Sequence, residues 1–534
     1  MHAKDLPLKR AAGAAKLPPD GTGSAPRALL PVVLLALGTV VSAIASLNVA
    51  LPEIARDTGA NQTELQWIVD AYALTFAAFL LPFGGLGDRF GRRRALVAGL
   101  VIFGAGSVAA LFVTEPTPLI LLRGVLGLGA AFVMPATLSI LTTTFDSHHR
   151  ERAVALWAGI AGASAVLGLL AAGLLLEIGS WQTVFGLNAV LAAAATIAVL
   201  RQVPDSRDAK AARLDPVGAG LSALALGALV AAIIEGPERG WTDGLVLGGF
   251  AAGLVGLAAF VVWERRHPAP LLDPRIFRSP AVTGGALSLL VQFFAFFGWI
   301  FLALQYLQVV QGWSPLIAAL CLVPMGIAVM GTSRAAPKLV AKAGVARVAP
   351  VGLVVLATGM GVLSLLEPGS SYWLVLGGVL LTGCGMGIAT TPATTAIVEG
   401  MPRAKQGVAS ALNDLSRELG GALGIAVLGS LLADRYASGI AEQTAALPPP
   451  AAEAAGSSIG AATQLAPTLP DGASFVAAAQ ASFAEGLSLA LSVAAVAVLA
   501  TAIVVAALLR RAQERSHDQR DARVGIGGTT SQTA

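Results

Sequence analysis

The sequence predicts an all-α integral membrane protein, and three observations lead to this fold class. Hydrophobic residues make up 55% of the 534 residues and charged residues only 12%, and the mean hydropathy is +0.75, which does not fit a soluble domain. Apolar stretches of about twenty residues, long enough to cross a bilayer as helices, recur along the chain. The loops between most of them are short, which favours antiparallel packing of neighbouring helices.

Fourteen apolar stretches are expected to span the membrane. They cover residues 28–51, 65–87, 95–114, 117–142, 153–176, 181–201, 216–235, 245–263, 281–304, 316–334, 348–367, 373–395, 407–432 and 487–509. The first follows a polar leader without a signal-peptide pattern or a small-residue cleavage site, so we expect it to be retained as a span.

The spans are expected to be arranged as six, two and six helices. The predicted parts are a cytoplasmic leader (1–27), an N-terminal six-helix bundle (28–201), two inserted helices (216–263), a C-terminal six-helix bundle (281–509) that includes an external loop (433–486), and a disordered cytoplasmic tail (510–534). The Ala- and Pro-rich external loop ends in ASFVAAAQASFAEG, where Phe475 and Phe483 are two helical turns apart. This loop is expected to be either a solvated linker or to include a short surface helix.

The charges predict the orientation of the chain. With an even number of spans both termini lie on one side, and a cytoplasmic assignment places 30 of the 35 Lys and Arg residues in cytoplasmic segments. Only Arg56, Arg239 and Arg435 fall in external loops. Arg123 and Arg417 fall within spans, and the count includes Arg201 and Arg334, the last residues of their spans, with the cytoplasmic segments that follow. This bias is a strong positive-inside signal. The net charge of +4 therefore reflects orientation in a bacterial cytoplasmic membrane, and a nucleic-acid partner is not expected.

A weak internal repeat supports the two-bundle arrangement. LGDRFGRRRALVAG (86–99) aligns with LVAKAGVARVAPVG (339–352), and both segments are expected in cytoplasmic loops. The first follows the second span and the second follows the tenth, as two six-helix halves separated by two extra helices would require. Repeated halves are common in secondary transporters, which alternate access around a central site.

The chemistry-bearing residues do not predict an enzyme. The two cysteines, Cys321 and Cys384, lie in different spans, and no disulfide framework follows from them. All five histidines fall in predicted cytoplasmic loops or tails, and there is no HExxH spacing or GxxxxGK[ST] motif, so metal-assisted catalysis and ATP-driven transport are not expected. No metal site or cofactor is predicted.

The stretch GGLGDRFGRRRAL (84–96) places an acid and four arginines between two apolar runs. Positive-inside charge alone accounts for the arginines but not for an acid flanked by glycines. The pattern resembles the G-x-L-a-D-r-x-G-r-k signature between the second and third helices of the major facilitator superfamily, where it implies a cytoplasmic gate. The matched positions are Gly84, Leu86, Asp88, Arg89, Gly91, Arg92 and Arg93. A glycine at 91 permits a tight turn, and Asp88 can accept charge-assisted hydrogen bonds.

Further motifs resemble the fourteen-helix drug:H+ antiporter branch of that superfamily. They are LNVALPEIA (47–55), QWIVDAYALTFAAFLLPFGG (66–85), LILLRGVLGLGAA (119–131), IIEGPERGW (233–241), ERRHPAPLLDPRIFRSP (264–280) and YLQVVQGWSP (306–315). In the fifth span, SAVLGLLAAG (164–173) keeps Gly168 and Gly173 of the antiporter motif. The resemblance implies a major facilitator fold and a proton-driven exporter of small lipophilic compounds.

The sequence departs from that branch at several positions. Ala43 stands where the first helix usually carries an aspartate, and Leu126 stands where the fourth-helix motif has a glutamine. Leu169 and Ala172 interrupt the Gly-Pro and Gly-Gly pairs of the fifth helix, and Gln182 replaces an arginine. The missing acid at position 43 raises the alternative of a facilitator that is uncoupled or coupled through other residues.

The ionisable residues expected within spans are the candidates for coupling. Arg123 is costly in a span unless it faces a cavity or a partner, and Asp70 lies near the external end of the second span. Asp414, Arg417 and Glu418 share a face of the thirteenth span because their spacings are i,i+3 and i,i+4. This trio is expected to be either a proton carrier or a structural ion pair.

The stretch VQFFAFFGWIFLALQYLQ (291–308), which begins in the ninth span and runs past its end, carries the candidates for the substrate cavity. They are Gln292, Phe293, Phe296, Trp299 and Gln305. Aromatic side chains with a few amides suit amphiphilic ligands, and packing or lipid-facing aromatics are the alternative. We expect a multi-pass monomer whose partners are the lipid bilayer, a small lipophilic substrate and protons.

Overall fold

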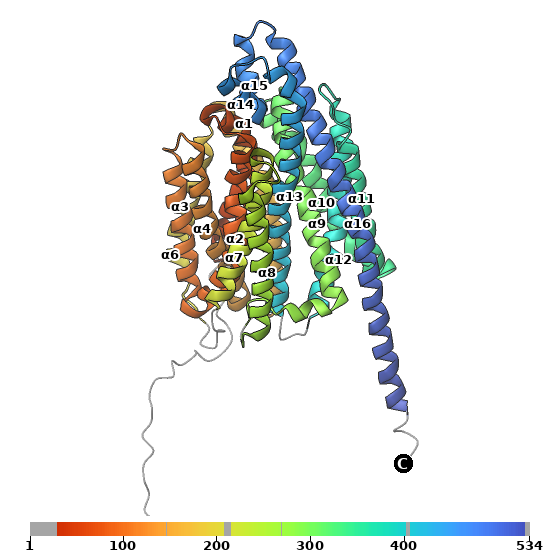
Figure 1. The fold of residues 1–534 in the computed structure, drawn as a ribbon. Helices are drawn as coiled ribbons and strands as arrows, with labels where there is room; N and C mark the ends of the chain where they lie inside the picture. The colour runs from red at the N-terminus through yellow and green to blue at the C-terminus, as the bar shows by residue number, and fades with distance from the viewer. Residues whose placement is uncertain (1–28, 146, 208–214, 269, 402–405, 529–534) are drawn as a thin grey trace, which may run out of the picture.

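The structure, a computed structural model, describes residues 29–145, 147–207, 215–268, 270–401 and 406–528. Within these ranges the chain is helical, with short connections and no strand. The long helices run side by side in one bundle (Figure 1). The predicted all-α class is confirmed, whereas the leader (1–27) lies outside the described residues.

Twelve helices in the described ranges are long and apolar enough to cross a membrane. A thirteenth is added if the bent pair Gln62–Leu80 and Pro82–Phe90, which turns by 52°, is one span. Proline lacks the backbone N–H that continues a helix, which accounts for the bend at Pro82. A further apolar stretch, Ala163–Ile178, is shorter, so the expected number of fourteen stays a prediction.

The helices form two groups with the same internal contacts. The first group, here the N half, consists of α1 (Leu29–Thr58), α2 (Gln62–Phe90), α3 (Arg92–Ala110), α4 (Pro116–Thr144), α5 (Ser147–Ile178) and α6 (Gln182–Gln202). The second group, here the C half, consists of α9 (Pro280–Gln305), α10 (Pro315–Ala343), α11 (Val345–Leu363), α12 (Tyr372–Glu399), α13 (Gln406–Thr444) and α16 (Gly472–Gly528). The N-half pairs α1·α5, α2·α4, α3·α4, α3·α6 and α1·α6 correspond to the C-half pairs α9·α13, α10·α12, α11·α12, α11·α16 and α9·α16.

Two glycines make equivalent breaks in the two halves. Gly91 separates α2 from α3 with φ of +125°, and Gly344 separates α10 from α11 with φ of +80°. Each N–H is bonded to the carbonyl oxygen four residues earlier, that of Gly87 and that of Val340. Only glycine adopts such backbone angles without strain. The turn expected at Gly91 is confirmed, and the aligned loops (86–99 and 339–352) have the same geometry.

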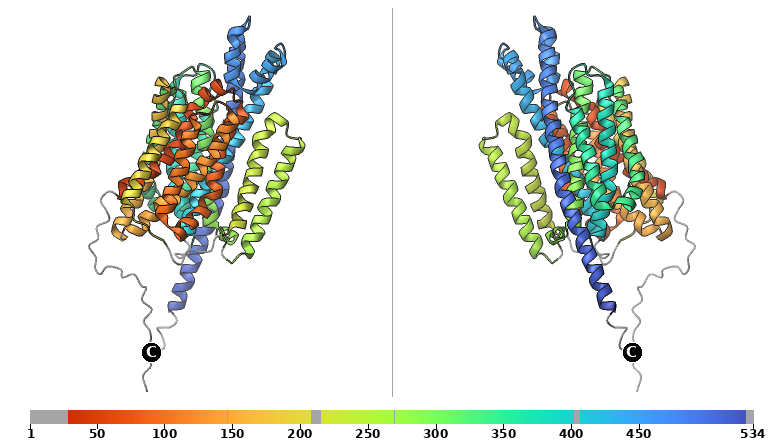
Figure 2. Two further views of the ribbon diagram at one scale, coloured as in Figure 1. Left: turned by 90° about the vertical axis from the view of Figure 1, so that its left-hand side faces the viewer. Right: turned by 90° about the vertical axis from the view of Figure 1, so that its right-hand side faces the viewer.

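The inserted helices α7 (Pro216–Arg239) and α8 (Gly244–Arg266) form an antiparallel hairpin beside the two halves (Figure 2). Helix α7 packs against α2 of the N half and α13 of the C half. Ile234 is fully buried there, in a cluster with Ala426 that also includes the partly buried Trp67. Most of α8 is exposed in the structure, as an apolar helix that faces lipid would be. The hairpin therefore covers the seam between the halves on one side.

The segment expected as an external loop is helical. Helix α13 runs on to Thr444, and α14 (Pro449–Ser457), α15 (Ile459–Leu465) and the short turn η4 (Ala466–Thr468) precede α16. We call α14, α15 and η4 the cap. The Tyr436 hydroxyl donates to the carbonyl oxygen of Ala455 at 3.0 Å. The expectation of a solvated linker is therefore wrong, because buried contacts hold the segment in helices.

The expected short surface helix is part of α16 itself. Phe475 and Phe483 lie on this helix and are 7% and 1% exposed. At its other end α16 continues to Gly528, so the tail expected to be disordered from residue 510 is helical up to that residue. Residues 529–534 lie outside the described ranges.

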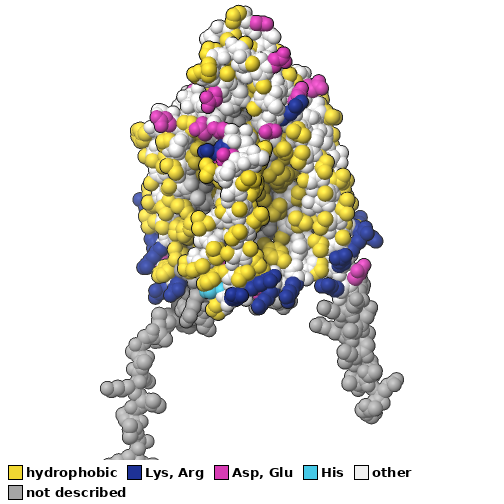
Figure 3. All heavy atoms as spheres, viewed as in Figure 1, with side chains coloured by type: hydrophobic (Ala, Val, Ile, Leu, Met, Phe, Trp, Pro, Cys, Tyr) yellow, Lys and Arg dark blue, Asp and Glu magenta, His cyan; other side chains and the backbone are white. Residues whose placement is uncertain are grey.

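Charged side chains separate the two ends of the bundle. Lys and Arg gather along the lower rim in Figure 3, whereas Asp and Glu gather toward the upper end and on the cap. We call these the basic end, where α2 meets α3 and α8 terminates, and the acidic end, which carries the cap. The band between them is apolar, as a lipid-exposed surface requires.

Candidate functional site

Three charged side chains lie on α13, in the part of the helix nearer the basic end. Asp414, Arg417 and Glu418 are each partly exposed although α13 packs against helices of both halves. Both carboxylates interact electrostatically with Arg417. The Cζ atom of Arg417 lies 4.5 Å from the ring centroid of Phe293 on α9, within cation–π range. The predicted trio is therefore brought together, and an aromatic ring from the cavity candidates supports its guanidinium.

Tyr72 on α2 links this trio to Arg123 on α4. The Arg123 guanidinium lies 4.4 Å from the centroid of the Tyr72 ring, and its Nε donates to the carbonyl oxygen of Ile68 at 2.8 Å. Tyr72 interacts electrostatically with both Arg123 and Glu418. Arg123 is only 1% exposed, so it faces a protein partner, as an arginine within a span requires. The Arg123–Tyr72 contact joins α4 to α2 within the N half, and Tyr72 is the residue of this pair that also lies near Glu418 on α13.

Asp70 is buried away from these groups. Its side chain is 0% exposed, and neither carboxylate oxygen has a hydrogen-bond partner among the described residues. It is one turn from Gln66, whose Oε1 accepts from the Ser430 hydroxyl of α13 at 3.3 Å. A carboxylate buried without partners is costly, and an ionisable residue within a span marks a functional candidate.

The cavity candidates of α9 divide into buried and partly exposed groups. Gln292 and Trp299 are 0% exposed and Gln305 is 3% exposed, so these three are packed inside the C half in this conformation. Phe293 and Phe296 contact each other edge to face with ring centroids 6.2 Å apart. Phe296 is partly exposed, whereas Phe293 is 5% exposed and lies under Arg417. The five cavity candidates of α9 are therefore not all on an open surface in this conformation.

Hydroxyl groups from α12 fix the polar side chains of α9 and α13. The Thr390 hydroxyl donates to Oε1 of Gln292 at 2.8 Å, and Nε2 of Gln292 donates to Ser288. The Thr394 hydroxyl donates to Oδ1 of Asn413 at 2.9 Å, next to Asp414. These bonds hold Gln292 in the interior and orient the turn that carries the trio.

The gate motif forms a hydrogen-bonded cluster at the basic end of the N half. Asp88 Oδ1 accepts from Arg92 Nε at 2.8 Å and from the Ser139 hydroxyl of α4 at 2.8 Å. Arg93 donates to the carbonyl oxygen of Leu200. The acceptor role expected for Asp88 is confirmed, and the motif ties α2 to α3, α4 and α6.

The remaining motif positions have packing or surface roles. Arg89 is exposed and lies over the Phe90 ring at 5.6 Å. A Cβ on Gly84 would meet the side chain of Pro135 at 3.3 Å, and Leu86 is partly buried. Gly84 thus lets the end of α2 lie close to α4.

The two glycines of the fifth-helix motif allow close helix contacts of different kinds. A Cβ on Gly168 would lie 2.4 Å from the carbonyl oxygen of Ser42, within the N half. A Cβ on Gly173 would lie 2.9 Å from the Cα of Leu316 on α10, in the C half. Backbones approach this closely only where side chains are absent. Gly173 therefore lies at a contact between the halves.

Several described contacts join the halves near the acidic end. Besides the Gly173 contact, the Ser430 hydroxyl of α13 donates to the carbonyl oxygen of Ile233 at 2.8 Å and so ties the C half to the inserted helix α7. Nε2 of Gln308, in the turn η2 (Tyr306–Val310) after α9, donates to the carbonyl oxygen of Val49 on α1 at 2.9 Å. Together with the Gln66–Ser430 bond, these contacts fasten α1, α2 and α5 to the C half at that end.

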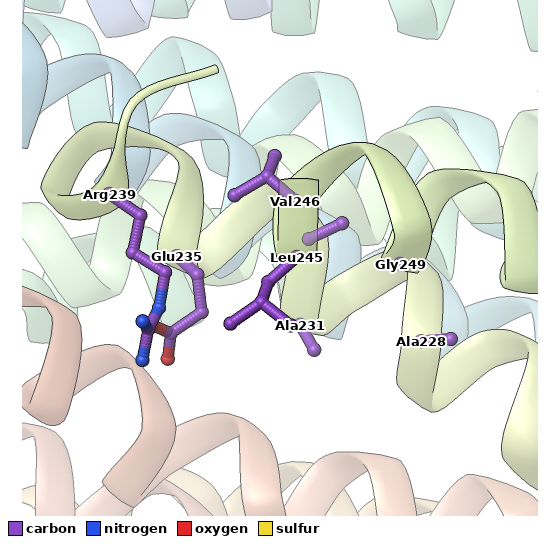
Figure 4. A pocket seen from close by; sticks show the side chains of 8 residues that line it. Ala228, Ala231, Glu235, Arg239, Leu245, Val246 and Gly249 are labelled. Carbon is purple, nitrogen blue, oxygen red and sulfur yellow. The ribbon is translucent and has the colours of Figure 1, made fainter. Parts of the chain in front are cut away.

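A cavity of about 240 Å³ lies on the inserted hairpin near the acidic end. It is lined by Ala228, Ala231, Ala232, Glu235, Arg239, Leu245, Val246 and Gly249 (Figure 4). Arg239 Nε is 2.8 Å from Glu235 Oε2, and Trp67 Nε1 donates to Glu235 Oε1 at 2.9 Å. None of the predicted cavity residues lines it, so it is separate from the trio on α13.

Sequence reasoning missed Tyr72, Ser139 and Thr390 as partners of the predicted residues. Tyr72 stands within the WIVDAYAL segment (67–74) that carried part of the family resemblance, two positions after Asp70. No comparable signal marks Ser139 or Thr390, because a hydroxyl in an apolar helix is common and its partner is set by tertiary packing. Among the described residues no group of three or more His, Cys, Asp or Glu could hold a metal ion.

Comparison with known proteins identifies relatives that cover most of the chain. A family model described as Major Facilitator Superfamily matches residues 33–425. The chain is 34% identical over 485 residues to the multidrug efflux pump LfrA of Mycolicibacterium smegmatis, covering 90% of this chain and 95% of that one. It is 34% identical over 408 residues to the multidrug resistance protein Stp of Mycobacterium tuberculosis, with 76% of each chain covered. It is 32% identical over 427 residues to the tetracenomycin C resistance and export protein of Streptomyces glaucescens, with 79% of each covered.

Solved structures share the fold at low identity. The crystal structure of a bacterial homologue of the human lysosomal transporter Spinster, in an inward-facing and unoccupied conformation, aligns with a TM-score of 0.65 and 19% identity. It covers 92% of this chain and 99% of that one. The crystal structure of the POT family transporter PepTSo aligns with a TM-score of 0.63 and 16% identity, with the same coverage.

Proposed function

Because the chain belongs to the Major Facilitator Superfamily, we propose that it exports small lipophilic or amphiphilic compounds, drugs or natural products, across a bacterial cytoplasmic membrane. Its relatives named as multidrug or antibiotic resistance proteins cover three quarters or more of the chain. The observation that carries the proposal furthest is the contact of Arg417 with Phe293 beside two carboxylates. That arrangement supplies aromatic area and titratable charge at one place on the seam between the halves.

Alternating access between the N half and the C half is the proposed mechanism. The described contacts between the halves that involve Gln66, Val49 and Gly173 lie near the acidic end. If the two halves are held together at the acidic end, the space between them opens toward the basic end. With the basic end and both termini in the cytoplasm, as the positive-inside bias favours, this is the inward-facing state that would load substrate from the cytoplasm. One chain contains both halves, which supports a monomer as the transporting unit.

Proton coupling is proposed to act through the α13 trio. Ala43 is 1% exposed and cannot titrate, so the acid usual in the first helix has no substitute at that position. Asp414 and Glu418 are partly exposed near Arg417, so water can reach them while the arginine compensates their charge. A proton taken up by either carboxylate would release Arg417 to change partners. Asp70, buried and unpartnered at the seam, is the further candidate.

The proposed substrate cavity is bounded by Phe293, Phe296 and the trio. Its aromatic rings provide apolar contact area, and the carboxylates provide attraction for positive charge. Gln292, Trp299 and Gln305 are buried in the present conformation, and they would support the cavity wall from behind. Asp88, with Arg92 and Ser139, is proposed to act as the cytoplasmic gate on the N half.

The test is efflux by the full chain, expressed in a bacterium lacking its own major pumps and challenged with a panel of antibiotics and dyes. Wild type should lower accumulation of at least one compound. Asp414→Asn and Glu418→Gln together should remove proton flux evoked by that compound in inside-out vesicles. Glu442→Gln is the matched control, because Glu442 lies on the same helix and is exposed. Unchanged flux in the double variant contradicts the trio as the coupling site.

The alternative is a facilitator without proton coupling, which Ala43 in place of the first-helix acid favours. The two functions are separated by an uncoupler that collapses the pH gradient. A coupled exporter then loses its ability to keep the compound below its equilibrium level in the cell, whereas a facilitator only equilibrates the compound faster and is unaffected.

A further inference from the structure

A group of titratable side chains lies at the basic end of the inserted hairpin, away from the proposed transport site. Asp215 directly precedes α7, and Glu264 and His267 lie at the end of α8. Asp215 is 3% exposed and Glu264 is 1% exposed. Two carboxyl groups are therefore enclosed together at the base of the hairpin.

Asp215 is well supplied with donors. Its Oδ1 accepts the N–H of Gly218 at 2.8 Å, which caps α7. Both oxygens accept from Nε1 of Trp263 on α8, at 3.0 and 2.9 Å. His267 Nδ1 is 3.5 Å from Oδ2. These bonds fix the Asp215 carboxylate against α8.

The Glu264 carboxyl group has fewer hydrogen-bond donors than that of Asp215. Its Oε2 accepts the backbone N–H of Leu272 at 3.1 Å, but its Oε1 has no donor among the described residues. Glu264 Oε1 and Asp215 Oδ2 would lie 2.3 and 2.6 Å from the same point, a Cβ placed on Gly218. The unpartnered oxygen therefore lies beside the same backbone position as the Asp215 carboxyl group, and the two carboxyl groups interact with each other.

We propose that Asp215 and Glu264 form a proton-binding site in which one proton is shared between the two carboxyl groups. Two buried carboxylates at this distance repel each other, and one bound proton converts the repulsion into an O–H···O bond. The charged and titratable groups that act on Glu264 are Asp215 and His267. The nearby Arg275 donates away from the pair, to the carbonyl oxygen of Arg265 at 3.3 Å.

The shared proton closes a link between three parts of the chain. Asp215 belongs to the start of α7, Glu264 to the end of α8, and Leu272 to the segment that leads through η1 (Pro274–Arg278) into α9. Helix η1 contacts both α8 and α9. With the proton bound, the base of the hairpin is fastened to itself and to the entry of the C half. At higher pH the proton is lost to water, which leaves two negative charges facing each other and weakens the link between α7, α8 and the segment that leads into α9.

The experiment measures thermal unfolding of the full chain in detergent at a series of pH values on both sides of neutrality. The folded state holds this proton more tightly than the unfolded state, so the stability it contributes is present at low pH and is lost as pH rises. The wild-type melting temperature should therefore fall with pH. The melting temperature of Glu264→Gln should fall less with pH. In this variant the amide N–H replaces the shared proton, and the amide oxygen still accepts from Leu272. Asp215→Asn, which places an N–H on the other side of the pair, should behave like Glu264→Gln.

The matched control is Asp243→Asn. Asp243 caps α8 as Asp215 caps α7, accepting from the N–H of Leu245 at 2.8 Å, and the bond is exposed. This variant should keep the wild-type pH slope. If the melting temperatures of Glu264→Gln and Asp215→Asn fall with pH as steeply as that of wild type, the shared proton is contradicted. Loss of the pH dependence in His267→Gln alone would assign it to His267 instead.

A spectroscopic measurement decides the same point without relying on stability. The infrared difference spectrum of wild type between high and low pH should contain the C=O stretching band of a protonated carboxylic acid. That band should be lost in both Glu264→Gln and Asp215→Asn and retained in Asp243→Asn. Its persistence in both pair variants contradicts the proposal.

Discussion

Gly173 of α5 and Leu316 of α10 lie so close that a Cβ on the glycine would be 2.9 Å from the leucine Cα. The two residues belong to different halves, and the contact is backbone against backbone. A side chain at position 173 cannot be accommodated by a rotamer change of its neighbour, because the atom it meets is part of the main chain. The closed acidic end therefore depends on the absence of one methyl group.

Gly173→Ala should force the halves apart at the acidic end and reduce efflux. Overpacking of this kind costs about 1–3 kcal/mol, which should also lower the melting temperature. Gly159→Ala on the same helix is the control, because a Cβ there would meet nothing within 4 Å and alanine favours the helix. Efflux assays and thermal unfolding of both variants check this. Equal behaviour of the two variants contradicts a role for the α5–α10 contact.

Gly91→Ala should destabilise the turn between α2 and α3. The φ of +125° at Gly91 is strained for any residue with a Cβ, at about 1–3 kcal/mol, and the Cβ would also meet Asp205 Oδ1 at 2.8 Å. Gly59→Ala provides the comparison, since Gly59 has φ of +72° but open space around it. We expect a larger loss of melting temperature at 91 than at 59. The reverse order would show that the loop rearranges and absorbs the substitution.

Tyr72→Phe and Tyr72→Leu should separate the ring of this residue from its hydroxyl. The hydroxyl is buried without a partner among the described residues, so the phenylalanine variant should fold and transport nearly as wild type. The leucine variant loses the ring over which Arg123 lies, at a cost of about 2 kcal/mol for a desolvated cation–π contact. Thermal unfolding and efflux measure both. A strong defect in Tyr72→Phe would instead assign the hydroxyl a role in transport.

Gln464→Ala should loosen the cap from the N half. Nε2 of Gln464 donates to the carbonyl oxygen of Arg56 at 3.0 Å, and loss of such a bond costs about 0.5–1.5 kcal/mol. Amide hydrogen exchange in α15 should rise accordingly, by several-fold. Gln480→Ala, which removes a bond from α16 to Val309 within the C half, should leave α15 unchanged. Unaltered exchange in Gln464→Ala contradicts attachment of the cap through this residue.

The fold class was predictable because bilayer thickness sets the length of an apolar helix. The turn at Gly91 and the acceptor role of Asp88 were also predictable, because the motif encodes local geometry. The cap was not, because its Ala- and Pro-rich sequence has the composition of a linker. Its helices are held by buried contacts such as that of Tyr436 with Ala455, which bring together residues distant in sequence.

The site was predictable only in part. Asp414, Arg417 and Glu418 are close in sequence, and helical spacing alone places them on one face. The position of Gln292 depends instead on the Thr390 hydroxyl of another helix. Helical periodicity does not reveal which face of α9 is packed against its neighbours. Asp215 and Glu264 come together only because α7 and α8 fold back on each other, so neither residue signals the other in the sequence.

The cap gives the two ends of the molecule different mechanical properties. It continues α13 and leads into α16, so it is anchored covalently in the C half, while Gln464 holds it to α1. In the proposed alternating access, separation of the halves at the acidic end would break the Gln464–Arg56 bond, and the cap would move with the C half. The cap would then act as a cover that is released from the N half each time that end opens.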